Sequence, residues 1–492
     1  ALQSRYGELQ NGNYKGKLVN AIWETGILQD LAVAYDLVFP ALTGAGALDL
    51  PRRTAPEVRK NIEANLLEEG IDSVGTAEIR GNFGMHQNAL VYSAVVRESV
   101  TQGVLLEQLF SATGGAQADE GLDYAFHNFV RKDGIAYENG LGYSFLWVDS
   151  FAEMARPLAL AGRDLYDEEK FRAMLRSPLA LISLGGFSPN AGDSGGITAK
   201  ATLPSKATYK DAFRKLGTPE MAFAWFTSAA GKVTDYESFE DLFYPPKAAE
   251  ATQLAASYSS GAQSRFLDGY GISFVSNRTD SIAASLFYGA WGSHYHYDRL
   301  GVELYGAGAR LSPDLGYPDF MNNYVPGIYT WSTHTISHNT LLVDDQKQSA
   351  NDSVPLYRIH HGKQLHVVDT LNGGGTTYPQ CDRYRRTLLL RDIGADKGYI
   401  LDVFRVRGGT KSYNLGFHAQ EGSFELHGAT LPAPITQGTL AGKDVELGEI
   451  YDDPVLGGPG YTGGFSGYKG SGFQHLFNWQ KVTPSTTVIA DW

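Results

Sequence analysis

The chain has 492 residues, of which 43% are hydrophobic and 19% are charged. A chain this long and this apolar can bury a large core, which excludes a disordered protein and indicates about two domains. Lysine and arginine number 41 against 54 aspartates and glutamates, so the net charge is −13. That balance argues against a nucleic-acid binder, because such proteins present a basic surface.

The single cysteine, Cys381, excludes a disulfide within the chain and any cysteine-based zinc or iron–sulfur site. A metal ion would therefore need histidine and carboxylate ligands. The sequence has no uninterrupted apolar run of eighteen residues, so we expect no membrane-spanning helix, and no signal peptide is visible at the start. Because the first residue is Ala1 rather than Met, we expect a leader or a longer N-terminal part to have been removed.

The first half of the sequence has the pattern of helices. Apolar residues recur at spacings of three and four over 56–69, 86–98, 167–176 and 219–230. This spacing places them on one face of a helix, so the first half is predicted to be all-α.

From about residue 270 the pattern changes to short β-prone runs between Gly, Asp, Asn and Pro turns. The predicted strands lie within 272–276, 282–288, 301–306, 338–344, 364–370, 386–392 and 399–406. A boundary is expected near Tyr244–Lys247, where two prolines precede a stretch of small residues. Helices followed by strands predict an all-α domain over 1–250 packed against an antiparallel β-sandwich over 251–492.

The segment Gly192–Gly196, with the sequence GDSGG, matches the nucleophile segment of trypsin-like serine proteases. Those proteases are double β-barrels with an upstream histidine in the first barrel, whereas the half of this chain ahead of the segment is helical and free of cysteine. We interpret the segment as a glycine-rich loop between helices.

The segment that could carry chemistry in the second half is Ser293–Asp298, with the sequence SHYHYD. If it is extended, His294, His296 and Asp298 project from the same side. A solvent-facing strand rich in imidazole is the alternative. Two histidines and one carboxylate from neighbouring strands would make a tetrahedral zinc site with one position left open, and Asp314 and His338 lie beside further β-runs.

In the helical half, Asn82 and His86 are four residues apart and share a face if one helix includes both. A helix cap and a satisfied histidine are the alternative interpretation of this pair. Further on, the segment 133–143 places acidic, amide and phenolic groups around two glycines and ends at Tyr143.

Taken together, these segments resemble the heparinase II/III-like group of polysaccharide lyases, which includes glycosaminoglycan lyases and several alginate lyases. The resemblance spans residues 81–418. It rests on GMHQ around His86, YENGLGY ending at Tyr143, the HYHYD segment, PDLGY with Asp314, His338-Asn339-Thr340 and the run ending at His418. The fold that it implies is an incomplete (α/α) toroid followed by an antiparallel β-sandwich.

The reaction that the resemblance implies is a β-elimination beside a uronic acid. The carboxylate of the sugar must be neutralised so that the developing enolate is stabilised, and Asn82, His86 and His294 match the positions expected to do this. Tyr143 matches the tyrosine that protonates the leaving oxygen. In syn elimination Tyr143 would also take the C5 proton, which requires a lowered pKa; in anti elimination His86 is the better base.

The resemblance also implies a metal site and substrate contacts. His296, Asp314 and His338 match the metal ligands of the family, with a structural zinc ion that would hold the loop carrying His294. The candidate substrate contacts are Glu138, Asn88, Arg80, Arg299, Tyr324 and Tyr329. Asn88 competes with Asn82 because some relatives have adjacent asparagine and histidine, and Tyr324 and Tyr329 compete for the role of a second tyrosine.

The implied substrate is an acidic polysaccharide, which would place the protein outside the cell or in the periplasm. Arg80, Arg299, Arg383, Arg385 and Arg386 could line a basic cleft or could be ordinary strand and surface charges. This number is low for a heavily sulfated chain, so alginate is favoured and a glycosaminoglycan is the alternative. A carbohydrate-binding protein without activity is the alternative of another class, and the oligomeric state is not indicated.

Overall fold

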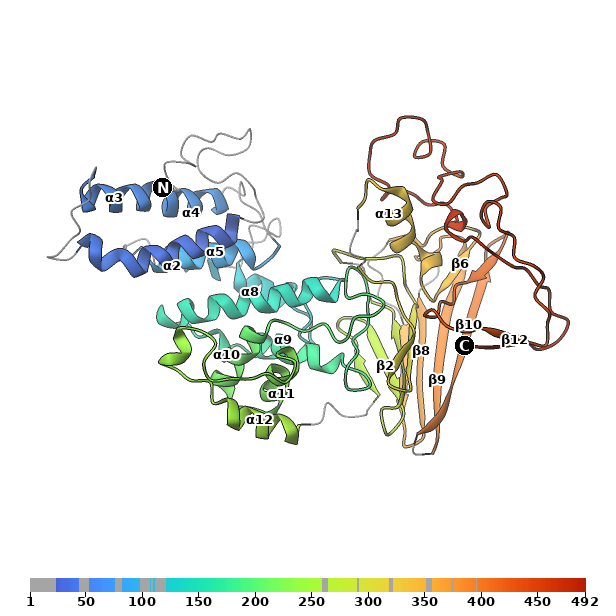
Figure 1. Cartoon of the computed structure of the whole chain (residues 1–492), viewed down its shortest axis with the longest axis horizontal. Helices are drawn as coiled ribbons and strands as arrows, with labels where there is room; N and C mark the ends of the chain where they lie inside the picture. The colour runs from blue at the N-terminus through green and yellow to red at the C-terminus, as the bar shows by residue number, and fades with distance from the viewer. Residues whose placement is uncertain are drawn as a thin grey trace. The chain divides into compact units, whose positions relative to one another are not determined.

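The computed structural model describes residues 24–43, 53–75, 82–97, 107, 109–110, 121–258, 264–289, 292–317, 322–350, 356–372, 376–394 and 396–492 (Figure 1). The chain forms two compact units, which are described one at a time. The helical unit draws its described residues from Ala1–Ala136, Ser144–Pro178 and Leu203–Tyr258, and the strand-rich unit from Tyr137–Tyr143, Leu179–Thr202 and Ser259–Trp492. Two short segments ahead of the expected boundary at residue 250 therefore group with the strands.

The predicted helices are all present, with small shifts at their ends. The helices are α2 (Glu24–Thr43), α3 (Ala55–Ile62), a π-turn (Glu63–Leu67), α4 (Glu68–Gly75), α5 (Met85–Val95), α7 (Leu122–Asn128), α8 (Leu141–Leu160), α9 (Glu169–Ala180), α10 (Lys206–Leu216), α11 (Pro219–Ser228) and α12 (Ala248–Ser257). Helices that are neighbours in sequence pack together, as α10 does with α11 and α11 with α12.

Local sequence explains where these helices begin and end. In α10, the Ser205 side chain accepts a hydrogen bond from the Thr208 amide at 3.2 Å, which satisfies one of the free N–H groups at the helix start. The helix ends at Gly217, whose φ of 61° is the left-handed conformation that glycine adopts without strain.

The small-residue stretch after Pro246 begins as a helix, and the two units divide further along it, after Tyr258. Residues Ala248–Ser257 form α12, with Ala248, Ala251 and Ala255 buried. Alanine is the best helix former, and its small side chain lets α12 pack closely on α11.

Helix α2 bears on the expectation that no helix spans a membrane, which stays a prediction. Its residues Thr25–Thr43 are long and apolar enough to cross a membrane by length and composition, with a mean hydropathy of 1.2. The apolar scan missed it because Asp30 and Asp36 interrupt the run. In the structure α2 packs on α3 and α5, and its Ala32 and Tyr35 are buried in a small core.

The strand-rich unit contains two main antiparallel sheets. The first has five strands in sequence order: β1 (Arg265–Leu267), β2 (Ile272–Ser276), β3 (Ile282–Phe287), β4 (Val302–Gly306) and β5 (Ala309–Ser312). The second has the order β10-β9-β8-β7, with β7 (Leu356–His361), β8 (Leu365–Asn372), β9 (Cys381–Gly394) and β10 (Lys397–Gly408). The predicted antiparallel β architecture is confirmed.

Shorter elements complete this unit. Two small sheets pair β6 (Leu341–Val343) with β11 (Tyr413–Leu415) and β12 (Glu425–His427) with β13 (Ile489–Asp491). Helix α13 (Pro326–Ser332) and the 3-10 turn Thr335–Ser337 lie between β5 and β6 in sequence, and the 3-10 turn Phe473–His475 lies between β12 and β13.

An apolar core joins the two main sheets. Val275, Ala284 and Leu286 of the five-stranded sheet pack with Val368 and Leu388 of the four-stranded sheet. These residues are at most 1% exposed. Because each sheet buries one face in this core, the unit is a β-sandwich.

A buried ion pair fixes the loop 188–199 to the five-stranded sheet. Arg310 Nη1 donates to Glu303 Oε2 at 2.7 Å, and the two side chains are 1% and 6% exposed. The other oxygen of Glu303 accepts the Asn190 amide at 2.7 Å, and Arg310 Nη2 donates to the Ser188 carbonyl at 2.7 Å. The loop therefore has a defined position on β4 and β5.

Replacing this arginine should destabilise the strand-rich unit strongly. We expect Arg310→Met to lower the free energy of unfolding by about 3 kcal/mol, because it leaves the Glu303 carboxylate buried without its cation. Arg407→Met is the control, since Arg407 and Asp382 form an exposed ion pair that water screens, so its loss should change the free energy of unfolding little. Denaturant unfolding measures both, and equal losses would contradict the prediction.

Candidate functional site

The side chains of Tyr143 and His294 stack on each other within the strand-rich unit. Their ring centroids are 3.5 Å apart and their planes differ by 5°. Tyr143 lies in the first turn of α8, and the Gly142 amide beside it donates to Ser194 Oγ at 3.2 Å. Both rings are only partly buried, so a ligand could reach their edges.

A carboxylate orients the imidazole. His294 Nδ1 lies 2.8 Å from Glu138 Oε2, and Glu138 is 3% exposed. A ring nitrogen that donates to a carboxylate fixes the tautomer, so Nε2 of His294 is the nitrogen left to face a ligand. Glu138 was predicted to contact substrate; its described contact is with His294.

The segment Ser293–Asp298 is not the extended strand that the alternation argument assumed. His294 has a φ of 54°, in the left-handed region that non-glycine residues rarely adopt, and the segment has no strand. The Asp193 amide donates to the His294 carbonyl at 3.0 Å, and the Asn139 amide donates to the Ser293 carbonyl at 2.9 Å. These contacts hold the bend, so His294 and His296 point to different partners.

Glycines let three loops cross at this point. A Cβ on Gly192, where φ is 59°, would lie 2.5 Å from the His294 carbonyl oxygen. A Cβ on Gly316, where φ is 64°, would lie 2.1 Å from the Ser194 carbonyl oxygen. Only glycine fits such close backbone approaches.

The surroundings of Tyr143 keep its phenol protonated. Burial, the hydroxyl of Tyr317 and the carboxylates of Asp193 and Glu138 all raise the pKa of Tyr143 above that of a free phenol. The Tyr317 ring lies edge-on at a centroid distance of 6.4 Å. A base would need a lowered pKa. The raised pKa of Tyr143 therefore suits a proton donor.

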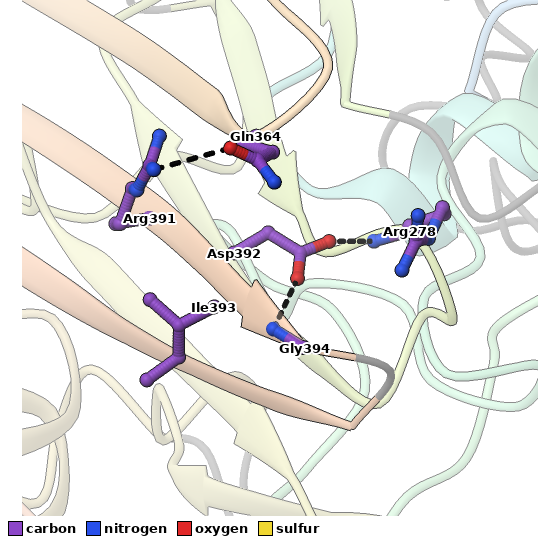
Figure 2. Close-up of a pocket in the computed structure, with 6 residues that line it drawn as sticks. All are labelled: Arg278, Gln364, Arg391, Asp392, Ile393 and Gly394. Atoms are coloured by element: carbon purple, nitrogen blue, oxygen red, sulfur yellow. Dashed lines mark hydrogen bonds between the residues drawn. The ribbon is translucent and has the colours of Figure 1, made fainter.

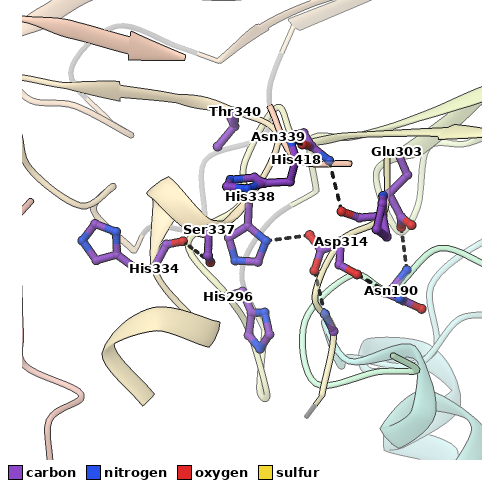
Figure 3. A network of polar contacts seen from close by, with 12 residues as sticks. Asn190, His296, Glu303, Asp314, His334, Ser337, His338, Asn339, Thr340 and His418 are labelled. Atoms are coloured by element: carbon purple, nitrogen blue, oxygen red, sulfur yellow. Dashed lines mark hydrogen bonds and ion pairs between the residues drawn. The ribbon is translucent and has the colours of Figure 1, made fainter. Parts of the chain in front are cut away.

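His296, Asp314 and His338 lie together and are buried, as predicted for the metal ligands (Figure 3). One ligand atom from each lies within 4.8 Å of the others. His338 Nδ1 is 2.6 Å from Asp314 Oδ2, and His338 Nε2 is buried without a hydrogen-bond partner among the described residues. Two imidazoles, one of which carries this unsatisfied nitrogen, and one carboxylate fit the donor set of zinc.

Two site residues were missed by the sequence analysis. Asp193 lies in the glycine-rich loop, which is irregular as predicted, and its Oδ1 is 2.9 Å from His296 Nε2. The segment had been considered only as a protease match. Tyr317 is the last residue of the PDLGY motif and contacts Tyr143, but one tyrosine among 28 carries no signal in the sequence.

Asp298 is buried, and burial raises its carboxyl pKa to about 6.

Asn82, His86 and Asn88 belong to the helical unit. Helix α5 begins at Met85, so Asn82 lies outside it and the expected shared helical face does not exist. His86 is 2% exposed in the first helical turn. Asn88 Nδ2 donates to Gln29 at 3.0 Å and to Glu153 at 2.6 Å, which favours a structural role. The catalytic roles of Asn82 and His86 stay predictions.

The remaining candidates for substrate contact differ in exposure. Arg80 lies outside the described residues. Arg299 is fully buried and its Nε donates to the Gly289 carbonyl at 2.9 Å, a structural contact. Tyr324 is 64% exposed and Tyr329 is partly buried in α13, so both stay predictions.

Comparisons with known proteins identify relatives. Residues 260–441 match the family described as heparinase II/III-like, C-terminal. The chain is 33% identical over 79 residues to an exo-oligoalginate lyase of Saccharophagus degradans, which covers 15% of this chain and 11% of the relative. The match to this curated relative thus spans only a small part of either chain.

Solved structures show the same fold. A heparinase III gene product superposes with a TM-score of 0.57 at 18% identity, covering 89% of this chain and 63% of that one. The heparan sulfate lyase HepC of Pedobacter heparinus gives 0.53 at 16% identity, covering 78% and 54%. The chain therefore spans somewhat over half the length of these structures.

We predict about one zinc ion per chain in untreated protein, held by His296, Asp314 and His338. Elemental analysis measures it, and His296→Ala should lose the metal because two ligands cannot hold it. His334→Ala is the control, since His334 is also buried but bonds the Gly470 carbonyl. Untreated protein without metal, or equal retention in both variants, would contradict this assignment.

Proposed function

Because this chain belongs to the heparinase II/III-like superfamily, we propose that it is a polysaccharide lyase that cuts a glycosidic bond beside a uronic acid by β-elimination. The observation that carries the proposal is the stack of Tyr143 on His294, with Glu138 holding the imidazole. The two rings offer a proton donor and a partner for a carboxylate in one place.

Each side chain has a task in the elimination. A base removes the C5 proton of the uronate, the electron pair forms the C4–C5 double bond, and the C4–O bond breaks. Tyr143 gives its proton to the leaving oxygen. In its imidazolium form, which carries a hydrogen on both ring nitrogens, His294 would donate from Nδ1 to Glu138 and from Nε2 to the sugar carboxylate, and so stabilise the negative charge that develops when C5 is deprotonated.

The raised pKa of Tyr143 favours the acid role and leaves the base to another residue. His86 is the base that we propose for anti elimination, supported by the resemblance at GMHQ. Asn82 is proposed to help neutralise the carboxylate. Both proposals rest on motif positions rather than on distances.

We propose that zinc is structural in this protein. When bound, the ion would supply a fixed positive charge and a rigid junction among His296, Asp314 and His338. His296 follows His294 by two residues, so anchoring His296 also limits the movement of His294. The hydrogen bond from His296 to Asp193 also limits the movement of this segment.

The substrate that we favour is alginate, with a glycosaminoglycan as the alternative. The match to an exo-oligoalginate lyase supports alginate, and the heparinase structures support the alternative. Arg299 and Arg386 are fully buried, which leaves fewer cations for a heavily sulfated chain. We further propose a secreted or periplasmic location and a toroidal arrangement of the helical unit, both in keeping with the superfamily.

A panel of acidic polymers tests the proposal. We expect incubation with alginate to raise the ultraviolet absorbance of unsaturated uronate, with smaller or no rises on hyaluronan, chondroitin and heparan sulfate. A rise in absorbance on heparan sulfate alone would show that the substrate is a glycosaminoglycan and not alginate. Binding without any rise would instead identify a carbohydrate-binding protein, and chain cleavage without the band would identify a glycosidase.

Removing the phenolic hydroxyl should abolish elimination. We expect Tyr143→Phe to lower kcat on the polymer by at least about 100-fold, because general acid catalysis contributes about that much. Tyr236→Phe is the control, since Tyr236 is 69% exposed in the helical unit. Circular dichroism checks that both variants fold, and near-normal turnover by Tyr143→Phe would remove Tyr143 from the mechanism.

A further inference from the structure

The outer face of the four-stranded sheet carries a cluster of arginines. The inner face of this sheet packs on the five-stranded sheet, so alternate side chains of β9 and β10 point away from it. We call the outward cluster on β7, β9 and β10 the arginine face. Its members are Arg358, Arg383, Arg385, Arg405 and Arg407.

The register places like charges directly opposite each other. Arg383 pairs with Arg407, and Arg385 pairs with Arg405, across β9 and β10. Like charges in opposed positions destabilise a sheet. A sheet face that contacts only water gains nothing from opposed arginines. An anionic partner would offset the repulsion between them.

Two carboxylates offset the arginines in part. Arg385 bonds Asp369 and, together with Thr387 and Arg405, lowers the pKa of that carboxyl. Arg407 bonds Asp382 at 2.7 Å, and Arg383 also lowers the pKa of Asp382. Five arginines against two aspartates leave 5 − 2 = +3 on this face, in a chain whose total is −13.

The face continues into an apolar strip and a cavity. Tyr399 and Leu401 are 54% and 49% exposed, and Tyr399 lies opposite Arg391 in the register. Beyond them, a cavity of about 350 Å³ is lined by Arg391, Arg278 and Gln364, among others (Figure 2).

The carboxylate among the residues that line this cavity, Asp392, already accepts hydrogen bonds from the backbone. Asp392 accepts the amides of Arg278 and Gly394 at 3.2 and 3.1 Å, and these bonds lower its pKa. Arg391 donates to the neutral Gln364 at 3.1 Å. The two guanidinium groups at the cavity thus remain suited to an anion of sugar size.

We propose that the arginine face and this cavity form a second, non-catalytic binding surface for an acidic polysaccharide. The proposal rests on the proposed lyase function for the identity of the polymer. Guanidinium groups bind carboxylates, and the exposed tyrosine and leucine suit the apolar faces of sugar rings. A surface of this kind would keep a long chain near the enzyme and would not affect short substrates.

Affinity electrophoresis in gels that contain alginate tests the surface, with Tyr143→Phe as the background so that the polymer stays intact. We expect Arg383→Ala/Arg405→Ala to weaken retardation about fivefold, and salt to weaken the retardation of the parent. Arg156→Ala/Arg176→Ala is the matched control, because both arginines are exposed on the helical unit. Unchanged retardation of the first variant would overturn the proposal.

Turnover separates this surface from the proposed function. With Tyr143 restored, Arg383→Ala/Arg405→Ala should lower kcat/KM on polymeric alginate severalfold and leave kcat/KM on an alginate trisaccharide unchanged. Equal losses on both substrates would overturn the second surface. If the unaltered protein shows no turnover, that result counts against the lyase function. The electrophoresis would still test whether the arginine face binds the polymer. Binding to phosphatidylglycerol vesicles without retardation by alginate would point to a membrane instead and overturn the proposal.

Discussion

The hydrogen bond between Glu138 and His294 is the interaction on which the candidate site depends. It fixes the plane and tautomer of an imidazole whose own backbone is held in an unfavourable left-handed conformation. The phenol of Tyr143 lies flat against that plane. Without this carboxylate His294 would lose the described side-chain contact that orients its ring, and the proposed arrangement of phenol and imidazole would be weakened.

The rest of the strand-rich unit supports this pair through contacts that reach far along the chain. Glu303 and Arg310 fix the loop that carries Asp193, and Asp193 in turn meets His296. The same unit brings Asp314 and His338 to His296. One folded unit therefore holds the proposed proton donor Tyr143, the imidazole of His294 and the proposed metal ligands together, which explains why segments near residues 140 and 190 group with the strands.

The sequence predicted the order of helices and strands because periodicity reports burial directly. It also predicted the grouping of His296, Asp314 and His338, although the stated reason was partly wrong. The argument for His294 and His296 assumed a strand, whereas the segment is bent and its histidines meet Glu138 and Asp193. Such contacts join residues more than 100 positions apart, and no local pattern encodes them. The burial of Arg299 could not be predicted from the sequence either, since a charged residue beside a strand is normally exposed.

The glycine crossings near His294 restrict how this protein can diverge. Gly192 and Gly316 bring backbones so close that any side chain there would push the loops apart. Natural variants must therefore keep these junctions and change residues elsewhere. In a saturation library, the two glycines should tolerate replacement as poorly as fully buried core residues, although neither carries a side chain that could contact a ligand.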